Sequence, residues 1–340
     1  MKTQAKILII QTAFIGDVIL ATPLIEALKR ELPDSQIHFL TIPKAVNIIE
    51  NNPHVTKIIE YDKHKRDKGI LGLYHFGRKI KREAYDICLT PHRSLRSAYL
   101  TRKTRAQKRI GFDRSAWKGA FTDIIIYPRS KHEIERNLSL LAALDIKSET
   151  IKPFIYPTEE DINHVETLLT GADITTGLPL FAIAPASVWP TKRWPTEYYA
   201  RFCQLVAGAN LVPVLIGGAE DSTLCAEIQH TCKEARIFAG RLTLRQTCYL
   251  LQKCAGLLTN DSAPLHVGQA AGIPVYAIFG ATVPQFGFAP RGKQDLVIEN
   301  SNLACRPCSI HGQYKCPTGT FDCMLSLKPQ EVFGLIFKKG

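Results

Sequence analysis

The segment 257–282, LLTNDSAPLHVGQAAGIPVYAIFGAT, combines residue types that could bind an anion and the hydroxyls of a sugar. An apolar run is followed by a polar turn with Asp261 and Ser262, a helix opening at Pro264 and a second apolar run. Such a strand–turn–helix–strand unit buries both strands in a parallel sheet and leaves the turn at their carboxyl edge. There the free N–H groups of the helix can hold an anion, and Asp261 can accept from sugar hydroxyls. The same residues could also serve as an ordinary helix cap.

Three other loops in the second half of the chain follow predicted strands. PASVWPTKRWP supplies Ser187 and Lys192 just before a helix, and a hydroxyl with a mobile cation suits a diphosphate. GGAED supplies Glu220, which can accept from ribose hydroxyls, and AGRLT supplies Leu242, which can frame a flat base. Each loop alone could be an exposed turn or a cap. Together, on one sheet edge, they predict a nucleotide-diphosphate site.

A candidate base stands near the start of the chain. In FIGDVILATP, Gly16 permits a tight turn after the apolar run 7–10, and Asp17 opens the helix predicted over 17–30. A carboxylate there either caps the helix or takes the proton of a substrate hydroxyl. The GxGxxG pattern of a dinucleotide site does not follow this run.

Two series of elements must position these residues. Apolar runs predict strands at 6–11, 36–41, 55–61, 85–90 and 108–112, and again at 180–184, 212–216, 236–238, 257–259 and 274–279. Helical patterns lie between them, including one at 132–144. The alternation predicts an α/β protein of two Rossmann-like doubly wound domains facing each other across a cleft. We expect an N-terminal domain at 1–172, a C-terminal domain at 173–327 and a last helix, 328–340, packing back toward the first domain.

The positive charge of the chain is concentrated in one region. The net charge is +12, and residues 62–136 hold 20 Lys or Arg against 8 Asp or Glu, so the rest of the chain is balanced. Such a region either attracts a polyanion, whether nucleic acid, anionic lipid or phosphorylated glycolipid, or is merely a solvated face. The apolar run near the N-terminus is too short for a membrane span or a signal peptide, which predicts a cytoplasmic protein.

Four of the ten cysteines lie close together in sequence, in the pattern Cys305-x2-Cys308-x7-Cys316-x6-Cys323. Disulfides spread through the fold are not expected in a cytoplasmic protein. The cluster could hold a structural Zn²⁺, form two disulfides or remain as free thiols. In each case we expect a structural role and not a catalytic one.

Three motifs resemble those of a known family in the same order along the chain: FIGDVILATP, PASVWPTKRWP and TNDSAPLHVGQAAGIPVYAIFGAT. They resemble the bacterial ADP-heptose:lipopolysaccharide heptosyltransferases, glycosyltransferase family 9. The resemblance implies a GT-B fold and an inverting transfer of heptose from ADP-heptose, without a catalytic cofactor. The implied acceptor is the inner core of lipopolysaccharide (Kdo-lipid A or heptosyl-Kdo-lipid A), at the inner membrane surface. We expect a monomer that binds no nucleic acid.

The resemblance also implies roles for individual residues. Asp17 would be the general base. The donor would contact Ser187 and Lys192 through its diphosphate, Glu220 through its ribose, Leu242 through its adenine, Asp261 through its heptose, and Ser262 near the phosphates. His266 would either orient the turn or be an ordinary core histidine. The acceptor candidates in the basic region are His92, Arg93, Arg96 and Arg109.

Other functions remain compatible with these residues. The protein could transfer another sugar to a different surface glycan, or it could be a sugar-nucleotide epimerase of the same architecture. An epimerase would need acids and a histidine converging on one sugar. A non-enzymatic polyanion binder would instead show tight, salt-sensitive binding to nucleic acid.

Overall fold

The computed structural model describes residues 4–147, 149–172, 174 and 177–337 and divides the chain into two compact units, Met1–Tyr156 and Pro157–Gly340. The boundary lies before helix α7 (Glu159–Gly171), which corrects the predicted boundary at 172/173. The reason is that α7 packs on α10 (Leu244–Gln252) in the second unit. Arg245 Nε lies 2.7 Å from Asp161 Oδ2, and this pair joins the two helices.

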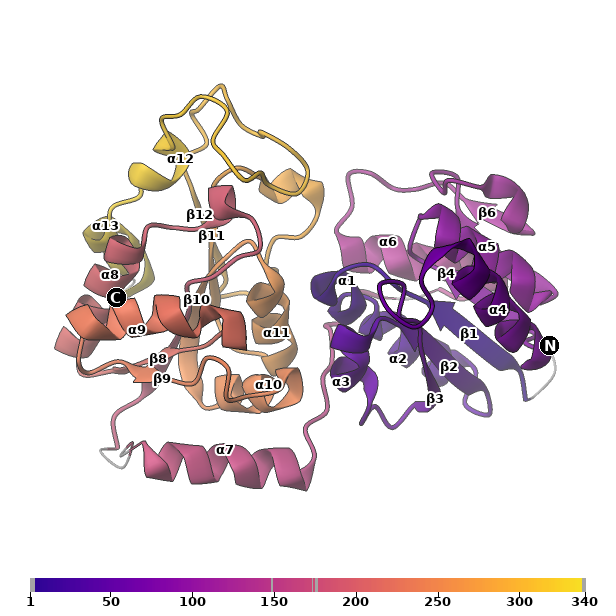
Figure 1. The fold of residues 1–340 in the computed structure, drawn as a ribbon, viewed down its shortest axis with the longest axis horizontal. Helices are drawn as coiled ribbons and strands as arrows, with labels where there is room; N and C mark the ends of the chain where they lie inside the picture. The colour runs from indigo at the N-terminus through magenta and orange to yellow at the C-terminus, as the bar shows by residue number, and fades with distance from the viewer. Residues whose placement is uncertain (1–3, 148, 173, 175–176, 338–340) are drawn as a thin grey trace. The chain divides into compact units, whose positions relative to one another are not determined.

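The first unit contains a six-stranded parallel sheet in the order β3-β2-β1-β4-β5-β6 (Figure 1). Its strands are β1 (Lys6–Ile10), β2 (Gln36–Thr41), β3 (Val55–Glu60), β4 (Ile87–Thr90), β5 (Lys108–Phe112) and β6 (Asp123–Ile125). Its helices are α1 (Ile15–Ile19), α2 (Thr22–Glu31), α3 (Val46–Ile49), α4 (Gly69–Arg82), α5 (Leu95–Thr104) and α6 (Glu133–Ser139), with short 3-10 helices at Pro43–Ala45, Lys118–Ala120 and Leu140–Leu144. The strand order reverses between β1 and β4, which defines a switch point.

The second unit repeats this plan. Its six-stranded parallel sheet has the order β12-β11-β10-β7-β8-β9, which reverses between β7 and β10. Its strands are β7 (Leu180–Ala184), β8 (Val212–Leu215), β9 (Arg236–Ile237), β10 (Cys254–Asn260), β11 (Val275–Phe279) and β12 (Leu296–Glu299). Besides α7 and α10 it has α8 (Thr196–Gly208), α9 (Ser222–Thr231), α11 (Ala263–Ala271), α12 (Asp322–Leu325) and α13 (Pro329–Phe337), with 3-10 helices at Pro190–Lys192, Ala219–Asp221 and Pro284–Phe286. Two doubly wound α/β domains are therefore confirmed.

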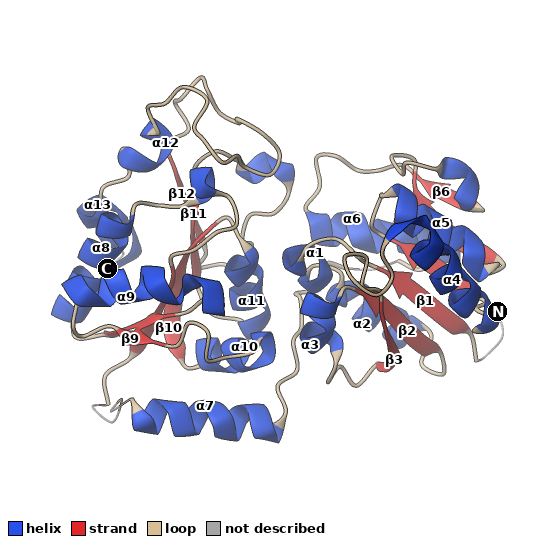
Figure 2. Cartoon of the chain, in the orientation of Figure 1, coloured by secondary structure: helices blue, strands red, loops and turns tan. Residues whose placement is uncertain are grey.

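The helices cover both faces of each sheet, as the cartoon in Figure 2 shows for the second unit, where α8 and α9 lie opposite α10 and α11. In the first unit, Leu8 and Ile10 of β1 form one core with Phe76 and Ile80 of α4. Successive residues of a strand point to opposite faces. The fully buried Ile9 of β1 therefore serves the other face of the sheet. Burial on both faces explains why the strands of this chain are continuous apolar runs.

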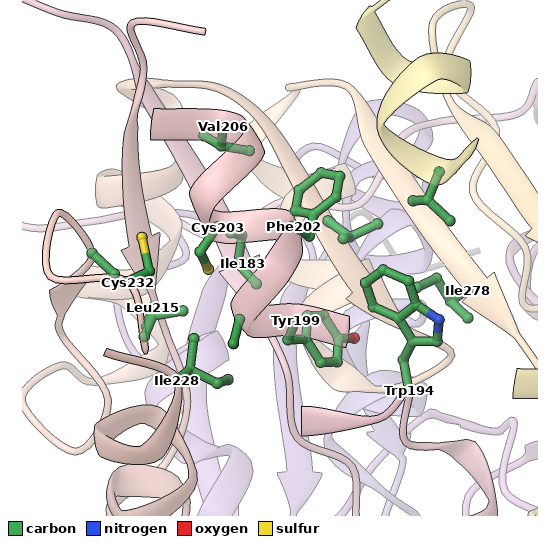
Figure 3. Packing of buried hydrophobic residues seen from close by; sticks show 14 of the residues in the cluster. Ile183, Trp194, Tyr199, Phe202, Cys203, Val206, Leu215, Ile228, Cys232 and Ile278 are labelled. Carbon is green, nitrogen blue, oxygen red and sulfur yellow. The ribbon is translucent and has the colours of Figure 1, made fainter. Parts of the chain in front are cut away.

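Aromatic side chains fill the core of the second unit, where Trp194 and Tyr199 lie side by side near Phe202 (Figure 3). The ring centroids of Trp194 and Tyr199 are 5.0 Å apart, in an edge-to-face arrangement. The last helix, α13, packs on α8 in this unit, and the Phe337 ring lies 5.2 Å from that of Phe181. The expectation for the last helix placed it toward the first domain. Its apolar side instead completes the core of the unit to which it belongs.

The helix predicted over 17–30 is two helices, α1 and α2. Pro23 stands in the first turn of α2 and has no N–H to continue the hydrogen bonding of α1. No helix among the described residues is long and apolar enough to cross a membrane.

Candidate functional site

The polar turn after β10 contains a buried ion pair. Lys192 Nζ lies 2.6 Å from Asp261 Oδ2, and the two side chains are only 12% and 11% exposed. Thr282, which follows β11, donates its hydroxyl to the same carboxylate oxygen at 2.6 Å. Burial strengthens the attraction because little water screens it. The structure thus brings together two residues that are far apart in sequence and that the sequence assigned to one site.

Asn260 fixes this turn at the switch point between β7 and β10. Its Nδ2 donates to the carbonyl of Pro185 at 2.9 Å, and its Oδ1 accepts from the N–H of Trp194 at 3.1 Å. The side chain is fully buried. Ligands of doubly wound sheets bind outside the carboxyl ends of the strands at such a point. Asn260 therefore joins the two loops that frame the expected ligand position.

The amino terminus of α11 adjoins the ion pair. Ser262 occupies the N-cap position, but its side chain makes no capping hydrogen bond. Its hydroxyl instead donates to the carbonyls of Ala186, at 3.5 Å, and Asn260, at 3.4 Å. The sequence allowed Ser262 to be an ordinary helix cap, but its side chain does not cap α11. Uncapped N–H groups and the helix dipole favour an anion at this end.

Ser187 lies in the loop between β7 and α8, on the same sheet edge. The residue is buried, its Oγ accepts from the N–H of Trp189 at 3.4 Å, and its carbonyl accepts from Arg193 Nε at 2.7 Å. Arg193 is also close enough to Asp221 to oppose the rise that burial causes in the pKa of that carboxyl. The charge of Arg193, in the loop after β7, therefore acts on a carboxyl in the loop after β8.

The loops of Glu220 and Leu242 touch each other. The N–H of Gly240 donates to the carbonyl of Gly217 at 3.1 Å. Gly240 has φ +75°, and a Cβ there would lie 3.0 Å from the Ala219 Cα, so this contact requires glycine. Glu220 is exposed in its short 3-10 helix, and Leu242 is half-buried before α10. The expected ribose and base contacts are thus neighbours.

His266 is buried inside α11, and its Nδ1 hydrogen-bonds to Gln269 Oε1 at 3.0 Å. Burial lowers the pKa of His266, which keeps the imidazole neutral. The charges of Asp261 and Lys192 also act on this pKa, the first raising it and the second lowering it. These contacts agree with a residue that supports the turn.

In the first unit, Asp17 lies in the first turn of α1. Its Oδ2 accepts from the N–H of Phe14 at 3.2 Å, which is a capping contact. Burial raises the pKa of Asp17 to about 7, and the charge of Glu133 is the second largest cause of the rise. Two backbone N–H groups and the charge of Arg93 oppose it. A carboxyl group with this pKa can take up a proton near neutral pH.

Glu133 belongs to a buried network on α6. Its Oε2 accepts from Arg136 NH1 at 3.0 Å and from the Tyr127 hydroxyl at 3.3 Å. The guanidinium of Arg93 lies 4.2 Å from the centroid of the Tyr127 ring and that of Arg136 lies 5.0 Å from it. Burial raises the pKa of Glu133, and Arg136 opposes the rise. Two members of this network act on the pKa of Asp17: the charge of Glu133 raises it and that of Arg93 lowers it.

A cavity of about 900 Å³ opens beside the carboxyl ends of β1 and β4, the switch point of the first sheet. Thr12, which follows β1, shares a hydrogen bond of 3.0 Å with Nδ1 of His92, which follows β4. Burial lowers the pKa of His92 to about 4, so its ring is neutral at physiological pH. Basic side chains on the wall are those of Lys44, Lys63, Lys65 and Arg96, and Asp62 is the acid among the lining residues.

The four acceptor candidates do not all reach this cavity. His92 and Arg96 line it. Arg93 is exposed and stacks on Tyr127, toward the network around Asp17. The guanidinium of Arg109 donates to the carbonyls of Ala120, at 2.9 Å, and Ala106, at 2.6 Å. Arg109 thus stabilises the start of β5 and is not among the lining residues.

The four C-terminal cysteines are free thiols in the structure. Across the described part of the chain, no three or more His, Cys, Asp or Glu side chains form a group that could hold a metal ion. The structure therefore supports neither the structural zinc nor the two disulfides at Cys305, Cys308, Cys316 and Cys323.

The segment that holds these cysteines supports the turn of Lys192. The Thr191 hydroxyl donates to the carbonyl of Gln313 at 2.9 Å and accepts from the N–H of Gln313 at 2.7 Å. Gly312 has φ +97°, and a Cβ there would lie 2.8 Å from the Trp189 Cβ and 3.0 Å from the Cγ and Cδ atoms of Lys192. The aliphatic stem of Lys192 therefore packs directly on the backbone of this segment.

Comparison with known proteins identifies the family. The model of glycosyltransferase family 9 (heptosyltransferase) matches residues 73–316, more than half of the chain. The chain belongs to glycosyltransferase family 9. Among family members, lipooligosaccharide heptosyltransferase 2 of Haemophilus influenzae is 28% identical over 303 residues, 82% of this chain and 84% of that protein.

Solved structures of family 9 share the fold. The family 9 glycosyltransferase of Veillonella parvula has a TM-score of 0.85 at 24% identity, covering 96% of this chain and 95% of that one. A heptosyltransferase of Escherichia coli with ADP-2-deoxy-2-fluoro heptose has a TM-score of 0.74 at 16% identity, covering 98% and 100%. The predicted GT-B architecture is therefore confirmed for this family 9 chain.

Sequence reasoning missed several residues that the structure brings to these sites. Thr282 contacts Asp261, Asn260 joins the two loops of the second switch point, and Glu133 acts on Asp17. For Asn260 and Thr282 a signal existed, because each polar residue ends or follows an apolar strand. Glu133 gave no such signal, since its effect depends on how α6 packs.

Proposed function

We propose that this protein transfers heptose from ADP-heptose to the inner core of lipopolysaccharide, with inversion at the anomeric carbon. The observation that supports it most is the buried Lys192–Asp261 pair beside the uncapped start of α11, at the switch point of the second sheet. A cation and helix N–H groups suit a diphosphate, and a carboxylate suits sugar hydroxyls. Curated relatives in the family carry the name heptosyltransferase.

In this proposal the second unit binds the donor. Lys192, Ser187 and the start of α11 with Ser262 hold the diphosphate. Asp261 accepts from the heptose hydroxyls, while Glu220 and Leu242 contact ribose and adenine on the neighbouring loops. His266 is a positioning residue for the turn. When the bond from the anomeric carbon to the diphosphate breaks, Lys192 and the N–H groups stabilise the charge that develops on the leaving ADP.

The first unit binds and activates the acceptor. Asp17 takes the proton of the acceptor hydroxyl while that oxygen forms its bond to the anomeric carbon, so that the proton ends on the carboxyl group. A pKa of about 7 makes Asp17 a stronger base than an ordinary aspartate while leaving part of it ionised at neutral pH. His92 and Arg96 contact the acceptor from the cavity wall, and Arg93 orders the surroundings of Asp17. Arg109 has no part in this proposal.

We further infer that the protein works in the cytoplasm at the inner membrane, as a monomer without affinity for nucleic acid. The excess charge of residues 62–136 suits an anionic acceptor on an anionic surface. The chemistry requires no metal or organic cofactor, because Lys192 and the α11 N–H groups supply the positive charge.

The test is incubation with ADP-heptose and either Kdo-lipid A or heptosyl-Kdo-lipid A, followed by mass spectrometry of the acceptor. We expect one acceptor to gain a heptose as ADP is released. The Asp17→Asn variant should lose transfer but still bind ADP. Isomerisation of the sugar nucleotide without acceptor would instead indicate an epimerase, and transfer from another nucleotide sugar would change the donor. Salt-sensitive binding to nucleic acid without ADP affinity would indicate a polyanion binder.

A further inference from the structure

Helix α4 exposes large apolar side chains that the fold does not use. Ile70, Leu71 and Tyr74 are 87%, 74% and 44% exposed. The inner side of the same helix is fully occupied, since Phe76 and Ile80 belong to the core and Phe76 lies 4.7 Å from the Tyr61 ring. The exposed apolar residues therefore form a separate outer surface on the first two turns.

The outer surface continues along the helix as a cationic one. At 3.6 residues per turn, Arg78 and Arg82 follow Leu71 at i+7 and i+11 on one stripe, with Tyr74 beside it. All of these side chains are exposed. The stripe thus changes from apolar to cationic along α4, and no cation interrupts its first two turns. We call Ile70, Leu71, Tyr74, Arg78 and Arg82 the α4 face.

Positive charge also surrounds the α4 face. Residues 63–82 contain eight Lys or Arg and one acid, Asp67, whose carboxylate lies 3.0 Å from Arg66 NH2. Helix α5 lies beside α4 (Figure 1), and Lys103 Nζ of α5 lies 5.8 Å from the centroid of the Tyr74 ring. Among the described residues, no carboxylate forms an ion pair with Lys68, Arg78 or Lys81. The cations are therefore available to an external anionic partner.

We propose that the α4 face docks on an anionic phospholipid membrane, with Ile70, Leu71 and Tyr74 in the headgroup–acyl boundary and the cations on lipid phosphates. Interfacial helices have this combination of apolar side chains and Lys or Arg. A second copy of the chain is a poor occupant, because two such faces would bring like charges together. The purpose of this docking rests on the proposed function. Residues Asp62–Lys65 line the cavity, and their loop leads directly into α4, so docking through α4 would place the acceptor site next to the membrane.

The experiment is flotation of the full-length protein with vesicles of phosphatidylcholine containing phosphatidylglycerol, and with phosphatidylcholine vesicles alone. We expect binding to the anionic vesicles that weakens with salt. Ile70→Ser/Leu71→Ser should reduce the affinity by about tenfold or more, because two exposed apolar side chains lose their burial in lipid. Arg78→Gln/Arg82→Gln should also reduce it and flatten the salt dependence. The matched control is Ile126→Ser, at an apolar residue that is 80% exposed in the same unit but outside α4.

The proposal would be overturned if the Ile70→Ser/Leu71→Ser variant bound anionic vesicles as tightly as the wild type. It would also be overturned if the wild type bound both kinds of vesicle equally, or if the wild type formed a dimer in sedimentation analysis that only this variant failed to form. ADP affinity and transfer to a detergent-dispersed acceptor should be unchanged in the variant, because neither involves the α4 face. A wild type that binds vesicles through α4 but transfers no sugar would refute the proposed function and leave the docking surface standing.

Discussion

The reciprocal hydrogen bonds between Thr191 and Gln313 predict that a residue outside the ligand site controls ADP affinity. Thr191→Val keeps the shape of the side chain but removes both hydroxyl contacts, which are 2.9 and 2.7 Å long. Thr191 is only 4% exposed, so water cannot readily replace them. The main-chain hydrogen bond from Thr191 to Gln313, at 3.2 Å, would remain. The segment should therefore loosen without leaving the unit.

The size of the effect follows from these two contacts. Each intramolecular hydrogen bond contributes roughly 0.5–1.5 kcal/mol. The variant should populate states in which Lys192 is displaced, and ADP binding must then restore the competent state. The apparent dissociation constant of ADP therefore rises by the factor by which the competent state is destabilised. A loss of about 1–3 kcal/mol for the two contacts corresponds to ADP affinity weakened roughly 5- to 150-fold.

The assay is calorimetric titration of ADP into the wild type, Thr191→Val and Thr191→Ser. Serine keeps the hydroxyl and should restore most of the affinity, whereas a defect common to both variants would indicate general damage to the fold. The KM for donor should rise with little change in the KM for acceptor. Wild-type ADP affinity in Thr191→Val would refute the reasoning that the cysteine-rich segment holds Lys192 in place.

Three further outcomes are expected. The kcat/KM of the wild type should be constant above about pH 7 and should fall as the pH drops below it, because protonation of Asp17 removes the base. A pH–rate profile without this fall on the acid side (the acid limb) would contradict the role of Asp17. Glu133→Gln removes a neighbouring negative charge, so the acid limb should move to lower pH, while the control Glu135→Gln on the same helix should leave it in place. Phe202→Ala in the core of the second unit should destabilise the protein by roughly 3–5 kcal/mol in denaturant unfolding, since the side chain is fully buried against Phe181 and Trp194.

The sheets, and the sheet edge at which the predicted donor residues gather, were predictable because they depend on local sequence. Strands buried on both faces appear as apolar runs, and their carboxyl ends meet at one edge, so Ser187 and Asp261 could be assigned to one site. β6 and β12 were missed because both are short edge strands that are only partly buried, so neither appears as a buried apolar run. The domain boundary was misplaced because α7 precedes the second sheet in sequence, and only its packing on α10 shows which unit it joins.

Contacts between distant segments account for the rest of the unpredicted features. The contact of Thr282 with Asp261 depends on the register of β10 with β11, and the effect of Glu133 on Asp17 depends on the packing of α6. Arg109 was assigned to the acceptor by its charge alone. The structure shows its guanidinium bonded to two backbone carbonyls, and no property of the neighbouring sequence signals these contacts.

The shared strand order of the two sheets also bears on how such enzymes diversify. Each unit closes its own core and has its own switch point, and a single connection at Tyr156–Pro157 joins them. In the proposed function the first unit binds the acceptor and the second unit binds the donor. Substitutions in the first unit should then alter acceptor choice while the donor loops stay intact, and recombination at this connection should exchange one specificity in a single event. A lineage with one sugar nucleotide and many surface glycans can in this way vary one half of the enzyme and conserve the other.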